Sequence, residues 1–260
     1  MSEASVHETA IVSSAARIAP SVSIGPYTIV HDNVVIGEGT VIGAHCEIGH
    51  RASVRSAMPL TIGAESLIRS HSVLYEGSTL GDRLVTGHHV TIREGTVAGI
   101  GLQVGTLSDI QGDCVIGDYT RMHSNVHVGQ GSTIGSFVWL FPYVVLTNDP
   151  HPPSEVRLGV TVHDYAVVAT MSVLLPGVRV GEGALIGAHS SVSRDVAADS
   201  VVVGSPAKFV GAASDIAYRD GSGAKAYPWR YTFHRGYEES DVRRWLAEAE
   251  RRAASSTSDT

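Results

Sequence analysis

Apolar residues recur at every sixth position along most of the chain. From Ile62 to Leu146 in steps of six, fourteen of fifteen positions are apolar, and Thr86 is the exception. Similar runs cover Ile18 to Val54 and Val168 to Val192, and the region of Met58 shifts the phase by two residues. A six-residue period fits neither an amphipathic helix nor a half-buried strand, whose periods are about 3.6 and 2 residues. It predicts an all-β fold, a parallel β-helix in which each hexad forms one side of a triangular coil.

Two other positions of the hexad support this interpretation. The residue after the apolar position is frequently Gly, and the residue four after it is usually Ser, Thr, Ala or Cys. Gly allows tight backbone geometry at a corner, and a small side chain fits where the coil closes on itself. Cys46 and Cys114 both occupy the small position, which indicates packing rather than reactive thiols. Two cysteines are also too few for a disulfide framework.

The interruptions of the period predict the domain organisation. Residues 147–167 include three prolines in the run VVLTNDPHPPSEV, and since Pro cannot continue a strand ladder we expect an ordered excursion loop there. The period stops after Gly211, so residues 1–211 should form a β-helix of about nine coils. Residues 212–260 should form a C-terminal extension, with alternating aromatic residues and a helix at about 240–253 behind a Ser240 cap.

Composition narrows the possible partners. Charged residues make up 17% of the chain and its formal net charge is -7. This balance disfavours nucleic acid, because phosphate binding requires clustered Lys and Arg. The chain has no apolar run of about 18 residues and no basic-then-apolar amino terminus. We therefore expect no membrane span, no signal peptide and a cytoplasmic location.

Polar residues suited to chemistry concentrate in three motifs: TGHHVTIREG, RMHSNVHVG and the opening of the proline-rich loop. With eighteen residues per coil, residues 18 apart should stack about 4.8 Å from each other. This register predicts that His89 and Asn125 share a column two coils apart, and that His123 lies beneath Phe141. We expect these groups and Asn148 to converge on the middle of the helix.

The hexads, together with VVVGSPAKFV near their end, resemble the left-handed hexapeptide-repeat acyltransferases. The runs GHHVTIRE, RMHSNV and VVLTNDPHPPS resemble more closely the sugar-nucleotide N-acetyltransferases that act on dTDP-3-amino-3,6-dideoxyhexoses. The resemblance implies a left-handed β-helix that transfers an acyl group, most simply acetyl, from a coenzyme A thioester to a sugar amine. The residues that match the family's motifs are His88, His123, Asn125, Asn148 and Asp149, and the chain departs from them at His89, Phe141 and Tyr143.

The implied reaction assigns roles to these residues. An amine attacks only when neutral and loses a proton afterwards, which a His near its ordinary pKa accepts at neutral pH. His123 is the first candidate for the base or amine orienter and His88 the second, while the departing CoA thiolate is a third possible acceptor. Developing charge on the thioester oxygen needs a hydrogen-bond donor, for which Asn125 is the catalytic candidate. His89 and the Asn148–Asp149 pair are predicted to bind substrate.

The resemblance also places acetyl-CoA along a groove between adjacent subunits. We expect the backbone near Ala169 and Ala188 to contact the cofactor, with Lys208 close to a phosphate. The flat walls of a β-helix form closed pockets only when subunits pack side by side, which predicts a homotrimer with active sites between subunits.

The excursion loop should therefore serve a neighbouring chain. Its prolines make it too extended to fold back over its own coil, so we expect it to reach across the interface. Asn148 and Asp149 would then help to close the pocket that contains the neighbour's His123.

Three alternatives remain open at this stage. A zinc protein like the γ-carbonic anhydrases needs three imidazoles on one ion, whereas His88, His89, His123 and His127 occupy four different phases of the hexad, so we predict no metal. A non-catalytic hexapeptide scaffold shares the same fold. A UDP-sugar O-acyltransferase of the lipid A type is nearer in chemistry, although its helical tail is longer than the one predicted here.

Overall fold

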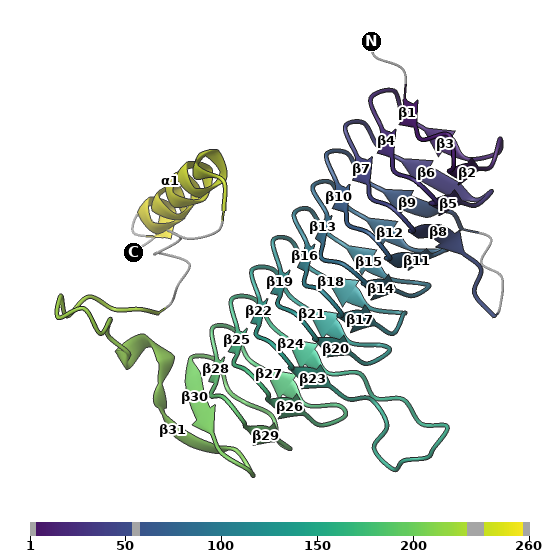
Figure 1. The fold of residues 1–260 in the computed structure, drawn as a ribbon. Helices are drawn as coiled ribbons and strands as arrows, with labels where there is room; N and C mark the ends of the chain where they lie inside the picture. Colours follow the sequence, from purple (N-terminus) through teal and green to yellow (C-terminus); the bar gives the residue numbers. More distant parts are fainter. Residues whose placement is uncertain (1–3, 54–57, 228–236, 257–260) are drawn as a thin grey trace. The chain divides into compact units, whose positions relative to one another are not determined.

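In the computed structural model the repeat forms a left-handed β-solenoid of about eleven turns, built from three parallel sheets (Figure 1). The structure describes residues 4–53, 58–227 and 237–256. By its internal contacts the chain divides into two units, Met1–Gly211 and Ala212–Thr260. The predicted fold class is confirmed. The predicted nine coils were too few, because the same range of the chain forms about eleven turns.

Successive coils contribute short strands to three sheets of twelve, ten and nine described strands, which we call A, B and C. Sheet A contains β1 (Ser5–Val6), β4 (Ser23–Ile24), β7 (Val41–Ile42), β10 (Leu67–Ile68), β13 (Val85–Thr86), β16 (Gln103–Val104), β19 (Arg121–Met122), β22 (Trp139–Leu140), β25 (Val167–Val168), β28 (Leu185–Ile186), β30 (Ser200–Val203) and β31 (Lys208–Ala212). Sheet B contains β2 (Ile11–Val12), β5 (Ile29–Val30), β8 (Glu47–His50), β11 (Val73–Tyr75), β14 (Thr91–Ile92), β17 (Asp109–Ile110), β20 (His127–Val128), β23 (Val145–Leu146), β26 (Val173–Leu174) and β29 (Ser191–Val192). Sheet C contains β3 (Arg17–Ile18), β6 (Val34–Ile36), β9 (Leu60–Ile62), β12 (Thr79–Leu80), β15 (Val97–Ala98), β18 (Val115–Ile116), β21 (Thr133–Ile134), β24 (Thr161–Val162) and β27 (Arg179–Val180).

The hexad positions form the interior of the solenoid. All fifteen positions counted from Ile62 to Leu146 are at most 5% exposed, including the polar Thr86. The Thr86 hydroxyl is satisfied there, because it accepts a hydrogen bond of 2.9 Å from the Arg69 backbone N–H. Burial of this continuous apolar column stabilises the stacked coils, since a single coil cannot bury its own hydrophobic face.

The small residues close the corners with hydrogen bonds. The Thr28 hydroxyl donates to the Gly43 carbonyl at 2.7 Å, and the Ser108 hydroxyl donates to the His123 carbonyl at 3.0 Å. Cys46 and Cys114 are buried free cysteines at the same position, and burial raises the pKa of both thiols. A buried thiol with a raised pKa is a poor nucleophile, which agrees with the packing role expected for both.

Two positions of each corner have different backbone requirements. Gly105 begins a corner where an added Cβ would lie under 3.0 Å from the backbone of His123 and Ser124, so Gly permits the close stacking of coils. The third corner residue instead has a left-handed backbone, and in most coils it is not Gly. Between sheets A and B these residues are Tyr27, His45, His71, His89, Leu107, Asn125, Tyr143, Met171 and His189, with φ between 55° and 62°.

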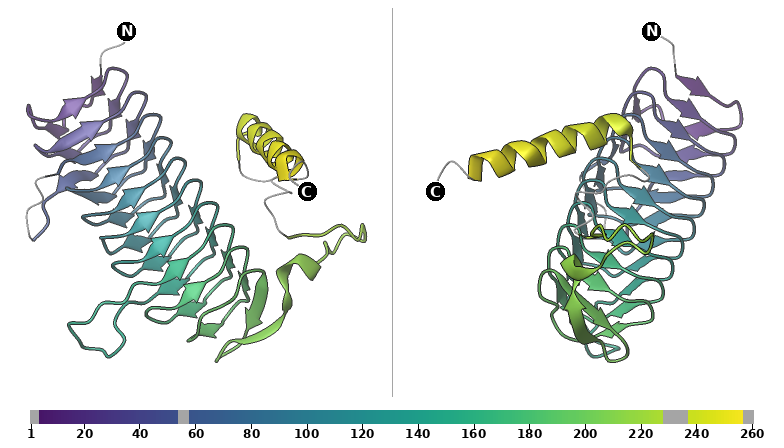
Figure 2. Two further views of the ribbon diagram at one scale, coloured as in Figure 1. Left: turned by 180° about the vertical axis from the view of Figure 1, so that it is seen from behind. Right: turned by 90° about the vertical axis from the view of Figure 1, so that its left-hand side faces the viewer.

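Two insertions leave the solenoid, both where sheet B passes to sheet C. Val85 pairs with Gln103, 18 residues on, in a regular coil. Val34 instead pairs with Leu60, 26 residues on, and Val145 pairs with Val173, 28 residues on. The insertions therefore add eight and ten residues, and the second is the proline-rich loop that projects after β23 (Figures 1 and 2).

The excursion loop is shorter than predicted. The predicted range 147–167 includes β24, which pairs with β21 through Thr133 and Thr161 and belongs to the solenoid. The Leu158 N–H donates to the Asn148 carbonyl at 2.8 Å and closes the base of the loop. Gly159 stands at the corner that leads into β24, where an added Cβ would lie under 3.0 Å from the Gly131 backbone.

The second unit contains η1 (Ala213–Asp215) and α1 (Glu239–Ser256). Helix α1 begins before Ser240, so this residue is not the N-cap; the Val242 N–H donates at 3.0 Å to the carbonyl of Glu238, which precedes the helix. Of the predicted aromatic run, Tyr227 is described, whereas Trp229, Tyr231 and Phe233 lie outside the described residues. No helix in the described part of the chain is long and apolar enough to cross a bilayer.

Candidate functional site

His123 begins the corner that joins β19 to β20, which we call the A–B corner of its coil. Its backbone N–H donates to the Leu140 carbonyl at 2.8 Å, so the next coil holds it in register. Its ring stacks on Phe141 with 4.7 Å between centroids and 18° between planes, as the 18-residue spacing predicted. Burial and then the charge of Arg121 lower the pKa of His123. The imidazole is therefore neutral at pH 7 and able to accept a proton.

A cation and an indole flank this imidazole. The Arg121 guanidinium lies over the Trp139 ring, 5.1 Å from its centroid, in a cation–π contact. The Trp139 ring in turn lies 6.0 Å from the His123 ring. This arrangement holds a positive charge beside His123, which explains why protonation of the imidazole is disfavoured.

His88 and His89 lie at the same corner, two coils before His123. His88 is exposed and its Nδ1 lies 2.7 Å from the Ser70 hydroxyl. His89 is exposed and stacks on His71 at 4.6 Å. The column order places His89 in line with Asn125, as predicted, but two coils correspond to roughly 9.6 Å. One substrate amine cannot contact His88 and His123 together.

Asn148 and Asp149 lie elsewhere, at the corner between sheets B and C, which we call the B–C corner. The Asn148 amide donates to the Gln130 carbonyl at 3.3 Å. Asp149 accepts hydrogen bonds from the Ser154 N–H at 2.9 Å and the Ser154 hydroxyl at 2.6 Å, and these bonds lower the pKa of Asp149. Both side chains therefore organise the loop within this chain. The expected convergence with His123 does not occur within one chain, because sheet B separates the two corners.

The residues expected to contact CoA are small or exposed. Ala169 follows Phe141 in the column that starts at His123, and the Phe141 N–H donates to the Val168 carbonyl at 2.9 Å. Ala188 lies at the next A–B corner and is exposed. Lys208 is exposed on β31. The A–B corner thus changes from aromatic rings at His123 and Phe141 to small side chains in the following coils.

A second polar centre, not singled out from the sequence, lies on sheet B in the same coil as His123. The His127 Nδ1 lies 2.9 Å from the Asp109 carboxylate, which also accepts a hydrogen bond from the Gln111 amide. The hydrogen bond to Asp109 raises the pKa of His127 although burial opposes it. The pKa of Asp109 is lowered, because these hydrogen bonds outweigh its burial. The 18-residue spacing of the two residues was a signal of this contact.

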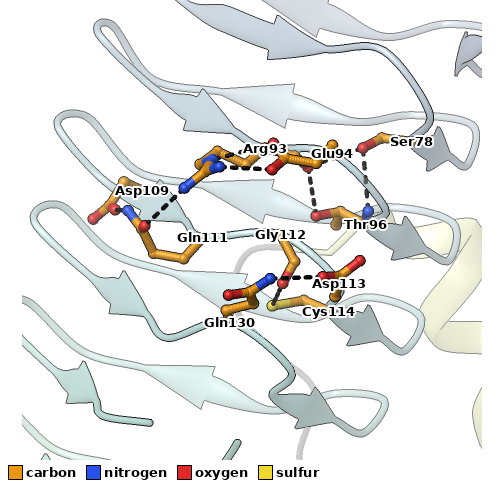
Figure 3. A network of polar contacts seen from close by, with 10 residues as sticks. All are labelled: Ser78, Arg93, Glu94, Thr96, Asp109, Gln111, Gly112, Asp113, Cys114 and Gln130. Carbon is orange, nitrogen blue, oxygen red and sulfur yellow. Dashed lines mark hydrogen bonds and ion pairs between the residues drawn. The ribbon is translucent and has the colours of Figure 1, made fainter. Parts of the chain in front are cut away.

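Asp109 and Gln111 adjoin further polar contacts near the B–C corner (Figure 3). The Arg93 guanidinium contacts the Glu94 carboxylate at 2.6 Å and the Gln111 amide oxygen at 3.5 Å. In the next coils the Gln130 amide donates to Asp113 at 2.7 Å. Since Asn148 bonds to the Gln130 carbonyl, these contacts reach the base of the excursion loop.

These side chains do not form a metal centre. Among the described residues no three His, Cys, Asp or Glu side chains are arranged to hold an ion. His88, His123 and His127 lie on different coils or faces, whereas zinc ligands must meet within about 2.0–2.2 Å of one ion.

Comparison with known proteins places this geometry in context. A family model described as the GMPPB C-terminal domain matches residues 1–102. The 2,3,4,5-tetrahydropyridine-2,6-dicarboxylate N-acetyltransferase of Staphylococcus aureus (strain Newman) is 36% identical over 92 residues, which are 35% of this chain and 33% of that protein. The aligned part thus spans about a third of the length of this curated relative.

A solved structure shares the fold over nearly the whole chain. The UDP-N-acetylglucosamine acyltransferase of Arabidopsis superposes with a TM-score of 0.69 and 20% identity, over 95% of this chain and 89% of that one. The chain shares its β-helix fold with that protein, and its sequence shows a hexapeptide repeat along most of the solenoid. In this hexapeptide-repeat protein His123 lies at the A–B corner of that fold, and His127 and Asp109 lie on the adjoining sheet B. The narrower resemblance to enzymes of dTDP-amino sugars stays a prediction.

Proposed function

We propose that this hexapeptide-repeat protein is an acyl-CoA-dependent N-acyltransferase. Its acyl group is acetyl, and its acceptor is the amine of a nucleotide-linked amino sugar of the dTDP-3-amino-3,6-dideoxyhexose kind. The observation that carries the proposal is the neutral His123 imidazole on the A–B corner, held by Phe141 and kept unprotonated by burial and Arg121. The N-acetyltransferase relationship to the staphylococcal protein supports the reaction class.

The proposed reaction uses His123 as the proton acceptor. The neutral amine attacks the thioester carbonyl, the new C–N bond forms, and the C–S bond breaks to release CoA thiolate. The proton leaves the amine for the imidazole of His123 and passes to the thiolate. Asn125, in the same corner, is the donor proposed for the oxyanion that develops on the carbonyl oxygen.

The second imidazole fits a different part of the same reaction. On one coil, the pKa of His123 is lowered and the pKa of His127 is raised. Such opposite shifts suit His123 to act as a base and His127 to carry positive charge. We assign His127, fixed by Asp109, to hold negative charge on the substrate. Ala169 and Ala188 leave the following corners open to the acyl carrier, with Lys208 assigned to one of its phosphates.

The site is proposed to be completed between subunits of a homotrimer. Asn148 and Asp149 lie at the B–C corner, away from their own His123, and the loop that carries them projects from the solenoid (Figure 1). A neighbouring subunit brings a B–C corner to an A–B corner without any rearrangement of the coils.

A thiol-release assay tests the proposed function. Acetyl-CoA is incubated with the protein and a panel of nucleotide-linked sugars that carry an amine, matched with analogues that carry a hydroxyl at the same carbon. We expect thiol release and a mass increase of the sugar only with the amines. Equal rates with the hydroxyl analogues would indicate a UDP-sugar O-acyltransferase instead, and no turnover or CoA binding with any sugar would indicate a scaffold.

A further inference from the structure

A continuous stack of rings lines the amino-terminal part of the A–B corner. Tyr27 stacks on His45 at 5.0 Å, His45 on His71 at 4.9 Å, and His71 on His89 at 4.6 Å, with planes within 17° to 21° of each other. The four residues come from four successive coils and are all exposed. We call this stack the imidazole ladder.

The backbone fixes the rungs of the ladder. Each rung has a left-handed backbone, with φ of 56° at His45 and 62° at His71. The His71 N–H donates to the Ala44 carbonyl at 3.0 Å, and the His89 N–H donates to the Ser70 carbonyl at 3.1 Å. These hydrogen bonds keep the Cα atoms that carry neighbouring rings one coil apart.

The ladder is not built to bind a metal. In nearly parallel rings the nitrogen lone pairs point the same way, so they do not converge on one ion between the rungs. This agrees with the absence of any three-residue metal cluster among the described residues.

The groups that act on the middle rung are all imidazoles. Crowding by its neighbours, followed by the charges of His89, His45 and His88, lowers the pKa of His71 below its ordinary 6.5. His88 is itself exposed and tied to Ser70. The groups acting on His71 include no carboxylate, so a proton on the ladder gains no countercharge from them.

We propose that the imidazole ladder is an acid-sensitive seam: its neutral rings stabilise the A–B corner above about pH 6.5, and like charges on adjacent rungs loosen these coils below it. The proposal does not depend on the acyltransferase function.

The direction of the pH dependence follows from linkage. An imidazole whose pKa is lowered by folding binds fewer protons in the folded than in the unfolded state. Its contribution to stability is present above the unfolded pKa of about 6.5 and is lost as the pH falls from there through the folded pKa. Solenoid coils open locally, so the loss should appear at the ladder rather than throughout the chain.

Hydrogen exchange of the full-length protein at pH 7.5 and pH 5.5 tests this proposal. After correction for intrinsic exchange rates, we expect amide protection at His71 and His89 to fall by about threefold or more in acid. The variant His71→Asn removes the middle ring, and Asn tolerates the left-handed backbone. We expect this variant to lose most of the extra acid sensitivity at His89.

His189→Asn is the matched control. His189 occupies the same corner position, with φ of 56°, and its N–H donates to the Thr170 carbonyl at 3.0 Å. This variant should keep the acid sensitivity of the wild type. Equal protection of the wild-type ladder at both pH values, or the same response in both variants, would overturn the proposal.

An NMR titration of the wild type provides a readout that needs no variant. The midpoint of His71 should lie below its ordinary value of 6.5, because His71 stacks between His45 and His89. A midpoint at or above 6.5 would also refute the seam.

Discussion

The A–B and B–C corners of the solenoid use the same hexads in different ways. The A–B corner contains neither insertion and lines up rings, in the imidazole ladder and again at His123 and Phe141. The B–C corner contains both insertions and a network of charged and amide side chains that ends at Asn148. Regular stacking of coils fixes the positions of the A–B corner residues, whereas the polar contacts of the B–C corner accommodate inserted residues. A base that needs a defined position is therefore better placed at the A–B corner.

The sharpest test of this contrast is the substitution His123→Asn. We expect turnover to fall by about 100-fold or more, since the imidazole handles the proton of the attacking amine. Unfolding should change little, because the half-buried ring lies outside the apolar interior. Steady-state rates across pH 5.5–9 measure both the loss of turnover and the disappearance of the fall in rate at low pH that protonation of His123 causes.

His189→Asn is the control for this loss, because it removes an exposed imidazole from the same corner and should retain wild-type rates. Full activity of His123→Asn with an unchanged pH–rate profile would assign the proton to the CoA thiolate instead.

Glycine substitutions compare the rigidity of the two corners. An alanine Cβ at position 105 would meet the backbone of His123 and Ser124, whereas at position 129 it would meet the Leu146 carbonyl at 2.6 Å and the Asn148 side chain at 3.2 Å. We expect Gly105→Ala to lower the free energy of unfolding by about 1–3 kcal/mol, and Gly129→Ala to lower it by less, because the three nearest contacts at position 105 are all backbone atoms under 3.0 Å, whereas at position 129 the Leu146 carbonyl is the one such atom among the three nearest. Denaturant unfolding measures both.

Gly211→Ala serves as the reference, since nothing lies within 4 Å of an added Cβ there. If Gly129→Ala were as costly as Gly105→Ala, the B–C corner would be as rigid as the A–B corner.

The sequence predicts the interior of the protein far better than its surface. Hexad counting identified buried positions correctly even at Thr86, because the apolar period and the coil are the same physical repeat. It showed the first insertion only through its phase: eight extra residues shift the hexads by two, so this insertion looked like two residues. The stacking of His123 on Phe141 followed from the 18-residue register alone.

The candidate site was less predictable, because register does not say which way a polar side chain turns. Asn148 and Asp149 are predicted substrate ligands, and within their own chain their side chains bond to Gln130 and to the loop. The pairing of His127 with Asp109 followed from their spacing but was obscured by the many surface histidines. The 18-residue register does not show which neighbouring side chains bond to each other, so the three-dimensional structure was needed to identify these partners.

Mixed oligomers test whether the two corners meet across subunits. We expect His123→Asn and Asn148→Ala chains each to be inactive alone. Co-expressed in equal amounts, they should form random trimers, about three quarters of them mixed, each with one intact site of three. Activity should then return to about one quarter of wild type in the thiol-release assay.

Mass spectrometry of the purified oligomers shows whether mixed trimers have formed. Confirmed mixed trimers without activity would mean that both residues serve one site of the same chain, and a monomer mass by light scattering would contradict the assembly itself.

The smallest expected effect concerns the Asp109–His127 pair between the two corners. Its side chains are 33% and 40% exposed, so solvent screening limits the pair to less than about 1 kcal/mol. The pKa of Asp109 is lowered, so its contribution to stability is present above about pH 3.8 and is lost as the pH falls through its folded pKa. The pKa of His127 is raised, so its contribution to stability is present below about pH 6.5 and is lost as the pH rises through its folded pKa.

Asp109→Asn should therefore destabilise the protein at pH 5.5 and have less effect at pH 9. Denaturant unfolding of both single variants and of Asp109→Asn with His127→Gln forms a double-mutant cycle at each pH. A coupling energy equal at the two pH values would show that the contact is an uncharged hydrogen bond and does not place a cation on sheet B.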